Sequence, residues 1–358
     1  MIDLDDIAAM TRQDPSGMMA LTVGFPEQCE RGVEIGNSFD PPAGWPTGPQ
    51  AFGNVVVTGL GGSAIGGDFL RSITEHEAKT PILVNRDYDL PGYVGDNSLI
   101  IAVSYSGNTE ETLSAYDQAK ARGARILVLT SGGALLERAR ADGNPALVVP
   151  GGQQPRASSG YTFFPVWRAV QKLGIISDKS ADTNEAVSLM KRQRDAFRPE
   201  EPTSTNSAKQ LAKALGGKLP VIYGSQGFRG IIAYRWHTQF NENAKIHAFS
   251  GAFPEMNHNE ILGWINAPKQ ADDWAVVMIR DRKDTSKIAT RVDTTKRLIG
   301  AGIPIHDVYA DGESALARLW TGVYYGDFVS VYLALVWGED PTVIPSIDAL
   351  KVELAKVQ

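Results

Sequence analysis

The residues best suited to chemistry are concentrated in one stretch, Gln239–Trp264, QFNENAKIHAFSGAFPEMNHNEILGW. Carboxylates, imidazoles and a lysine alternate there with large apolar side chains, so several charged groups are expected to sit beside a packed interior. Burial shifts the pKa values of such groups toward neutrality, which makes them candidates for proton transfer. Its four asparagines are poor helix or strand formers, but their amides suit turns and the orientation of neighbouring charges. We predict that this stretch forms half of an active site.

A second group of polar residues follows two predicted strands in the first half of the chain. GLGGSA continues the apolar run Asn54–Gly59, and SYSGNTEET continues Ser98–Ser104. In open α/β sheets, ligands bind beyond the carboxyl ends of strands, near the point where strand order reverses. Backbone amides at helix N-termini and small hydroxyl groups hold an anion without a fixed cation. The two loops together predict a phosphate site.

The first loop also satisfies the dinucleotide-binding pattern, as Gly59-x-Gly61-x-x-Ala64. The acidic residue that should bind a ribose is poorly placed, because Asp87 lies far beyond the usual spacing and Asn85 ends the strand. A dinucleotide fold has no need of a hydroxyl cluster after a third strand, whereas a terminal phosphate does. The sequence therefore favours a phosphate site over a dinucleotide site.

The elements that must position these groups follow a regular rhythm of strand, turn and helix. This rhythm predicts right-handed crossovers and a parallel, doubly wound α/β sheet. The run LPVIYG, the turn SQGFRG and a helix over 231–240 form a weak internal repeat of NVVVTGLGGSAIGG. Strands are expected at 54–59, 82–85, 98–104, 126–130, 147–150, 219–224, 274–279 and 303–308. Helices are expected at 69–74, 109–122, 134–141, 161–173, 286–299, 314–337 and 345–357, with one or two more over 3–40.

A chain of 358 residues favours two domains over one. We expect an N-terminal helical extension over 1–50, a first α/β domain over 51–178 and a helical linker over 179–212. The second α/β domain, with a C-terminal helix, is expected over 213–358. The first half carries more Gly/Ser loops and the second more ionisable residues.

Bulk composition narrows the classes of partner. A net charge of −6 argues against nucleic acid, since duplex binding depends on neutralising phosphates. The single cysteine, Cys29, excludes an intrachain disulfide and fits a reducing compartment. The acidic N-terminus lacks a signal-peptide pattern, and no apolar run is expected to reach membrane-spanning length. The histidines and carboxylates lack a zinc-binding spacing and the dinucleotide pattern is disfavoured, so we expect a cytoplasmic protein without metal or cofactor.

Six motifs in order resemble the bifunctional phosphoglucose/phosphomannose isomerases of the sugar-isomerase (SIS) superfamily. They are GLGGSAIGGD, VSYSGNTEET, PRASSGYTFF, QFNENAK, EMNHNEILGW and IDALK, and they cover most of the chain from about residue 50. SGNTEET alone marks only a SIS domain, whereas its combination with NENxK and NHNE is far more specific. The resemblance implies two SIS domains, each a parallel sheet flanked by helices. It also implies metal-independent interconversion of glucose 6-phosphate or mannose 6-phosphate with fructose 6-phosphate.

The resemblance assigns roles to individual residues. It implies Glu242 as the catalytic base, Arg156 beside that base, His258 for ring opening and Lys351 near the C-terminus. It also implies phosphate binding by Gly62, Ser63, Ser104, Ser106 and Thr109. A homodimer is expected, in which His258 serves the active site of the partner subunit.

These residue types suit the chemistry on their own terms. Aldose–ketose isomerisation moves a proton between adjacent carbons through an enediol, and a carboxylate such as Glu242 can take it and return it. Arg156 stays protonated throughout and can face the negative charge that develops on the enediolate oxygen. His258 titrates in the range needed to shuttle a proton to the ring oxygen, and Lys351 can orient the same hydroxyl.

Two other interpretations share the phosphate loops. A non-catalytic sugar-phosphate sensor needs the Ser/Thr loops but has no reason to keep the four proposed catalytic residues together. An amidosugar-phosphate isomerase or deaminase would use the same loops on a different substrate. The leading interpretation requires that the hydroxyl-lined loops and the ionisable stretch face one shared crevice.

Overall fold

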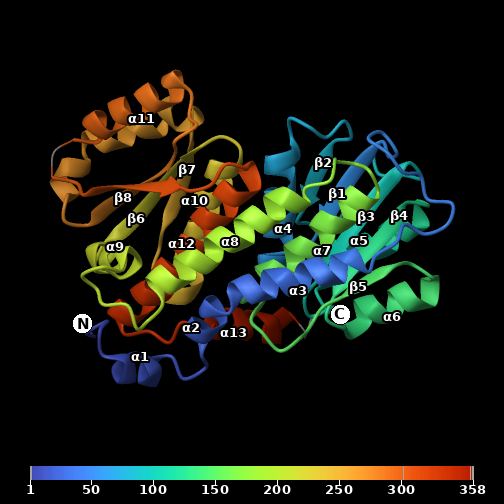
Figure 1. The fold of residues 1–358 in the computed structure, drawn as a ribbon, viewed down its shortest axis with the longest axis horizontal. Helices are drawn as coiled ribbons and strands as arrows, with labels where there is room; N and C mark the ends of the chain where they lie inside the picture. The colour runs from blue at the N-terminus through green and yellow to red at the C-terminus, as the bar shows by residue number, and fades with distance from the viewer. Residues whose placement is uncertain (1, 301, 355, 357–358) are drawn as a thin grey trace. The chain divides into compact units, whose positions relative to one another are not determined.

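The computed structural model describes residues 2–300, 302–354 and 356, and these divide into two compact units. The five-strand unit comprises Gly24–Lys191 and Gly312–Leu319, and the four-strand unit comprises Met1–Val23, Arg192–Asp311 and Trp320–Gln358. Each unit holds one parallel sheet flanked by helices, which confirms the predicted fold class (Figure 1). The units are assembled from separate pieces of the chain, whereas the predicted boundaries follow the sequence, so those boundaries stay a prediction.

The sheet of the five-strand unit is entirely parallel, with strand order β2-β1-β3-β4-β5. All residues of β3 are buried, as expected of a strand covered on both faces. The predicted strands are confirmed to within about two residues at each end. Their bounds are β1 Asn54–Thr58, β2 Ile82–Asn85, β3 Ser98–Val103, β4 Arg125–Thr130 and β5 Ala146–Val148.

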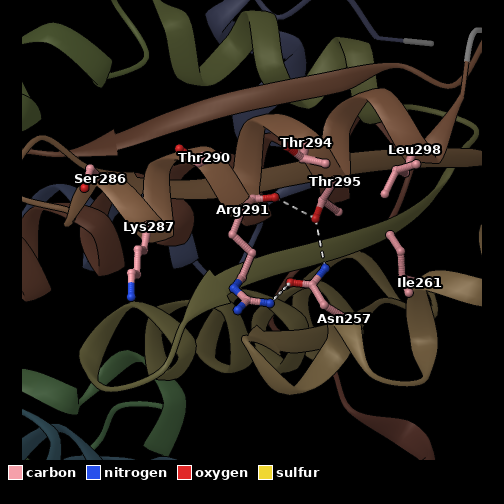
Figure 2. Close-up of a pocket in the computed structure, with 9 residues that line it drawn as sticks. All are labelled: Asn257, Ile261, Ser286, Lys287, Thr290, Arg291, Thr294, Thr295 and Leu298. Atoms are coloured by element: carbon pink, nitrogen blue, oxygen red, sulfur yellow. Dashed lines mark hydrogen bonds between the residues drawn. The ribbon is translucent and has the colours of Figure 1, made fainter.

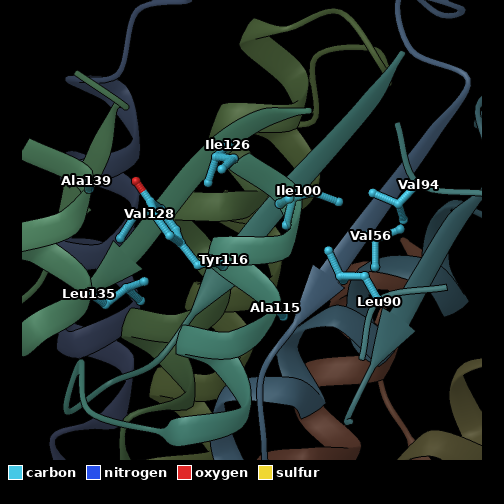
Figure 3. Close-up of a cluster of buried hydrophobic side chains, with 12 residues drawn as sticks. Val56, Leu90, Val94, Ile100, Ala115, Tyr116, Ile126, Val128, Leu135 and Ala139 are labelled. Carbon is cyan, nitrogen blue, oxygen red and sulfur yellow. The ribbon is translucent and has the colours of Figure 1, made fainter. Parts of the chain in front are cut away.

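Helices cover both faces of this sheet. On one face, α5 (Glu110–Ala121) and α6 (Gly133–Asp142) enclose a core that includes Ile100, Tyr116 and Val128 (Figure 3). The other face carries α4 (Gly62–Thr74), α7 (Ser159–Lys172) and α3 (Phe25–Asn37). Helices α3 and α7 pack closely: a Cβ added to Gly32 would lie only 2.8 Å from the Gly160 carbonyl oxygen, so only glycine fits there.

The four-strand sheet repeats this topology, with order β7-β6-β8-β9 and all strands parallel. Strand β6 therefore takes the place of β1, and the predicted internal repeat is confirmed. The edge strand β7 was not predicted. The bounds are β6 Leu219–Ser225, β7 Phe249–Phe253, β8 Trp274–Asp281 and β9 Ile305–Ala310.

One face of the four-strand sheet carries α10 (Phe228–Gln239), against which α12 (Ala315–Trp337) packs. The other face carries α11 (Ser286–Ile299) and the 3₁₀ turns Glu255–Asn257, Glu260–Ile265 and Ala267–Gln270. The remaining helices are α1 Ile7–Gln13, α2 Met18–Val23, α8 Ser180–Phe197, α9 Ser207–Leu215 and α13 Pro345–Leu354.

Two expectations need correction. The N-terminal segment forms α1, α2 and α3 rather than one or two helices, and Pro26 lies in the first turn of α3. Proline is tolerated there because the first amides of a helix have no intrahelical acceptor. Helix α12 is also long and apolar enough to cross a membrane, contrary to the expectation for the chain. Of its apolar 18-residue window, 94% is buried inside the structure, as in a core helix.

Candidate active site

The hydroxyl-lined loops lie at the topological switch point of the five-strand sheet. The chain leaves β1 toward β2 on one side, and β3 lies on the other side of β1. The carboxyl ends of β1 and β3 are therefore adjacent, and the loops after them lead into α4 and α5. This is the position at which open α/β sheets bind ligands.

Hydrogen bonds connect parts of the predicted phosphate site, Gly62, Ser63, Ser104, Ser106 and Thr109, which we call the hydroxyl cradle. Ser104 Oγ lies 2.8 Å from Thr109 Oγ1 and accepts the Gly107 amide at 3.1 Å. Ser63 Oγ accepts the Tyr105 amide at 3.2 Å, which ties the first loop to the second. Thr109 occupies the N-cap position of α5, but its hydroxyl makes no capping hydrogen bond. That hydroxyl instead faces Ser104 across the loop.

Arg156 belongs to the same end of this unit. It lies in the 3₁₀ turn Pro155–Ala157 before α7 and is 2% exposed. A Cβ added to Gly62 would lie 2.5 Å from the Pro155 carbonyl oxygen and 3.1 Å from the Arg156 amide. Glycine at this position therefore permits the Arg156 turn to approach the first residues of α4. The structure thus brings Arg156 beside Gly62 and Ser63.

Glu242 lies in the four-strand unit, in an unusual turn. After Gln239 the helix α10 widens into a π-helical turn, Phe240–Ala244, and Glu242 is its central residue, partly buried. Single π-helical turns are rare and occur often at functional sites, since the extra residue changes the direction of the side chains. The residue pattern there is that of an ordinary helix end, so the π turn was not predicted.

The neighbours of Glu242 shape this turn. Asn241 Oδ1 accepts the Ala248 amide at 3.0 Å, and Lys245 Nζ donates to the Asn243 carbonyl oxygen at 3.0 Å. Lys245 itself has a left-handed backbone, with φ of 55°. Such a backbone is uncommon for a residue other than glycine and persists where surrounding contacts determine it. The prediction that amides in this stretch fix turns is confirmed at Asn241.

His258 is exposed and lies at the end of the 3₁₀ turn Glu255–Asn257. The preceding residue, Asn257, connects this turn to α11: its Nδ2 donates to Thr295 Oγ1 at 2.9 Å, and its Oδ1 accepts Arg291 Nη1 at 3.3 Å (Figure 2). A cavity of about 500 Å³ lies along this junction. His258 therefore follows a turn whose last residue, Asn257, is hydrogen-bonded to α11.

Glu242 and His258 of one chain lie at opposite ends of β7. Glu242 precedes Phe249, which pairs with Val221 near the start of β6, and His258 follows Phe253, which pairs with Ser225 at its end. Five residues of strand span roughly 15 Å at about 3.3 Å per residue. The chain therefore runs the whole length of β7 between Glu242 and His258.

Lys351 lies on α13, a helix with no buried residue among those described. Its side chain is 67% exposed, and its Nζ lies 3.8 Å from Asp348 Oδ1. This ion pair joins two positions of the same helix and involves no other predicted site residue. The assignment of Lys351 therefore stays a prediction.

The switch point of the four-strand sheet has a different character. Arg229 follows β6 and pairs with Asp281 at 3.1 Å and Asp284 at 3.3 Å, at and after the end of β8. Its Nε also donates to Ser225 Oγ. Burial raises the pKa of Asp284, and the nearby Arg229 opposes this rise only in part. An internal ion-pair cluster thus occupies the position that corresponds to the cradle, which the weak sequence repeat did not reveal.

Among the described residues, no group of three or more His, Cys, Asp or Glu side chains is arranged to hold a metal ion. The groups assembled in the two units are hydroxyls, an arginine, carboxylates and an imidazole. These can bind a phosphate and move protons.

Comparison with known proteins first defines the class. Residues 52–140 match the SIS domain family, and residues 204–354 match the bacterial phospho-glucose isomerase C-terminal SIS domain family. The fold is similar to that of a hypothetical protein from Thermus thermophilus, with a TM-score of 0.72 and 17% identity, covering 98% of this chain and 93% of that one. The chain is thus a protein with two SIS domains.

Two curated relatives define the family. The chain is 43% identical to a bifunctional phosphoglucose/phosphomannose isomerase of Caldicellulosiruptor bescii, over 95% of this chain and 100% of the relative. It is 36% identical to one from Thermoplasma volcanium, over 85% of this chain and 92% of the relative. The chain belongs to the bifunctional phosphoglucose/phosphomannose isomerase family, which confirms the resemblance of its motifs.

Proposed function

We propose that this protein interconverts glucose 6-phosphate and mannose 6-phosphate with fructose 6-phosphate, without a metal ion or cofactor. The observation that carries the proposal is the hydroxyl cradle at the switch point of the five-strand sheet, beside Arg156, in a chain of this family. Its Ser and Thr hydroxyls and nearby amides suit the three oxygens of a terminal phosphate. We place the activity in the cytoplasm, in keeping with a single, buried cysteine.

In this proposal Glu242 moves the proton. Its carboxylate takes the proton from C2 of the open-chain aldose, the C–H electron pair forms the C1–C2 double bond, and the carbonyl pair of C1 moves onto O1 as an oxyanion. A proton passes from the C2 hydroxyl to O1. The carboxylic acid of Glu242 then returns its proton to C1 while an electron pair of O2 forms the C2 carbonyl of the ketose. Arg156 faces the developing oxyanion, and one hexose phosphate must reach both the cradle and Glu242.

Ring opening comes before the proton transfer at carbon. His258 exchanges a proton with the ring oxygen, because an imidazole ring has one nitrogen that can donate and one that can accept. We propose that Lys351 orients the same hydroxyl from the C-terminal helix. Its long, exposed side chain leaves the ammonium group available to a bound sugar.

The proposal includes a homodimer in which His258 acts in the partner's active site. It is supported by the order of the chain, in which Glu242 comes before β7 and His258 comes after the far end of that strand. A closed two-fold dimer would supply the missing histidine to each site symmetrically.

The decisive experiment is Glu242→Gln, assayed on both glucose 6-phosphate and mannose 6-phosphate. Glutamine keeps the size of the side chain but cannot accept the proton, so kcat is expected to fall at least about 100-fold on both sugars. Treatment of the wild type with a chelator is expected to leave both activities unchanged. Near-wild-type turnover by Glu242→Gln on either sugar would refute the assigned base.

The same assay separates the two alternative interpretations. A sugar-phosphate sensor would bind hexose phosphates tightly without interconverting them. An amidosugar isomerase or deaminase would turn over glucosamine 6-phosphate faster than mannose 6-phosphate. The proposed isomerase is expected to prefer mannose 6-phosphate in that comparison.

A further inference from the structure

The π-helical turn that carries Glu242 is held by helix α12. Asn243, the residue after Glu242, donates from Nδ2 to Ser330 Oγ at 2.9 Å. Ser330 Oγ in turn donates to the Asp327 carbonyl oxygen at 2.7 Å. Both Asn243 and Ser330 are at most 1% exposed. A buried hydrogen bond of this kind fixes geometry, since water is not at hand to replace a lost partner.

A second contact holds the helix just before the turn. The carboxylate of Asp327 accepts Gln239 Nε2 at 2.9 Å and pairs with Arg235 Nη2 at 3.3 Å. Burial raises the pKa of Asp327, and the bonds from Arg235 and Gln239 oppose this rise only in part. One residue of α12 thus holds the last two turns of α10, and its neighbour Ser330 holds the π turn that follows.

Side chains of α10 also pack directly against the backbone of α12. A Cβ added to Gly326 would lie 2.0 Å from Trp236 Nε1, and one added to Gly322 would lie 2.8 Å from an Ile232 side-chain carbon. The Trp236 indole donates to the Gly322 carbonyl oxygen at 2.9 Å. Glycine at these two positions lets α12 act as a rigid support beneath α10.

We infer that Ser330, supported by Asp327, is a positioning residue for Glu242. This rests on the proposed function, in which the Glu242 carboxylate must reach two adjacent carbons of the same sugar. A π turn is less regular than an α-helix and needs contacts outside itself to persist. Ser330 supplies such a contact through Asn243, and so sets the direction of the Glu242 side chain.

The test compares Ser330→Ala with the wild type. Because a small displacement of a reacting group has a large effect on rate, kcat is expected to fall about 10- to 100-fold while KM for glucose 6-phosphate changes little. Abstraction of the C2 proton should then limit turnover more strongly. The kinetic isotope effect with glucose 6-phosphate deuterated at C2 should therefore increase.

Two further variants distinguish positioning from general destabilisation. Tyr332→Phe removes another buried hydrogen bond of α12, from Tyr332 Oη to the Phe197 carbonyl oxygen at 2.6 Å. It is expected to lower Tm without changing kcat or the isotope effect. Combining Asn243→Ala with Ser330→Ala should reduce kcat no further than the more damaging single change, because both remove one interaction.

The outcomes separate this inference from the proposed function. An active Glu242→Gln variant would overturn both. An inactive Glu242→Gln variant, together with a Ser330→Ala variant that has wild-type kcat and isotope effect, would overturn the positioning role alone. The positioning role would also be overturned if Ser330→Ala lowered Tm but left kcat and the isotope effect unchanged.

Discussion

At the scale of single residues, the cradle depends on hydroxyl groups whose positions are fixed by one another. Thr109 is the clearest case, since its hydroxyl is directed to Ser104 instead of capping its own helix. One of these two hydroxyls donates its only proton to the other, so the second keeps its proton for an anion. An N-cap hydroxyl usually accepts a hydrogen bond from its own helix, so the contact with Ser104 instead supports the proposed binding role of Thr109.

Thr109→Val should therefore weaken binding of hexose phosphates. Valine keeps the shape of the side chain but removes a hydrogen bond to a charged group, worth about 1.5–3 kcal/mol, so Kd should rise about 10- to 100-fold. Isothermal titration with fructose 6-phosphate measures this. Thr112→Val is the matched control, because Thr112 Oγ1 is buried in the same helix with no hydrogen-bond partner among the described residues. Equal Kd values for the two variants would exclude Thr109 from the cradle.

The sequence indicated these hydroxyls because loop and strand are contiguous in the chain. It indicated neither the approach of Pro155 to Gly62 nor the bond between Asn243 and Ser330, which are 87 positions apart. Such contacts are decided by the packing of distant elements. A local sequence pattern cannot predict contacts between residues so far apart in the chain.

At the scale of elements, the buried strands could be predicted from the sequence, but the edge strand β7 could not. Runs of β-branched residues such as NVVVT predict a buried strand. Strand β7, FSGAF, contains two small residues and a serine, and it lies in a stretch rich in turn-forming asparagines. Its pairing with β6 overrides a weak local preference, which is why the sequence did not reveal it.

Elements are also joined by ion pairs whose effect depends on pH. Glu77, after α4, accepts the Ser177 amide at 2.9 Å and pairs with Lys179 Nζ at 2.8 Å. Burial alone would raise the pKa of Glu77, but the bonds from Lys179 and Ser177 outweigh it and lower the pKa from 4.5 to about 2. A lowered folded-state pKa stabilises the fold above the unfolded value, and the gain is lost as pH falls through the folded value.

Glu77→Gln should consequently destabilise the protein at neutral pH and have a shrinking effect between pH 4.5 and about 2. Urea unfolding of both proteins at a series of pH values measures this difference. Glu34→Gln serves as the control, since Glu34 forms an exposed pair with Arg31 that contributes little to stability. A difference for Glu77→Gln that stays constant from neutral pH down to about 2 would contradict the assigned linkage.

At the scale of the whole molecule, the repeated order of the two sheets followed from the rhythm of strands and helices along the chain. The different side chains at the two switch points did not follow from that rhythm. One became a hydroxyl cradle, and the other became the cluster of Arg229, Asp281 and Asp284. Duplicated folds keep their topology more readily than their sites, because a fold needs only apolar patterning whereas a site needs particular side chains.

The proposed exchange of His258 between subunits can be tested by mixing inactive variants. If Glu242 and His258 of each site come from different chains, a hybrid of Glu242→Gln and His258→Ala has one intact site and one doubly altered site. Random reassortment makes half of the dimers hybrids, so activity should recover to about a quarter of the wild type. If both residues came from one chain, every site in the hybrid would carry one defect.

The matched control is the double variant Glu242→Gln/His258→Ala mixed with Glu242→Gln. No arrangement of these chains contains an intact base, so activity should stay at the level of the separate proteins. Different affinity tags on the two chains allow hybrids to be purified before assay. Purified hybrids of the single variants that remain inactive would place His258 outside the partner's site, and so would a protein that stays monomeric while active. Recovery confined to the hybrids would require each active site to be built from two copies of this chain, because an intact Glu242 and an intact His258 occur there only on different chains.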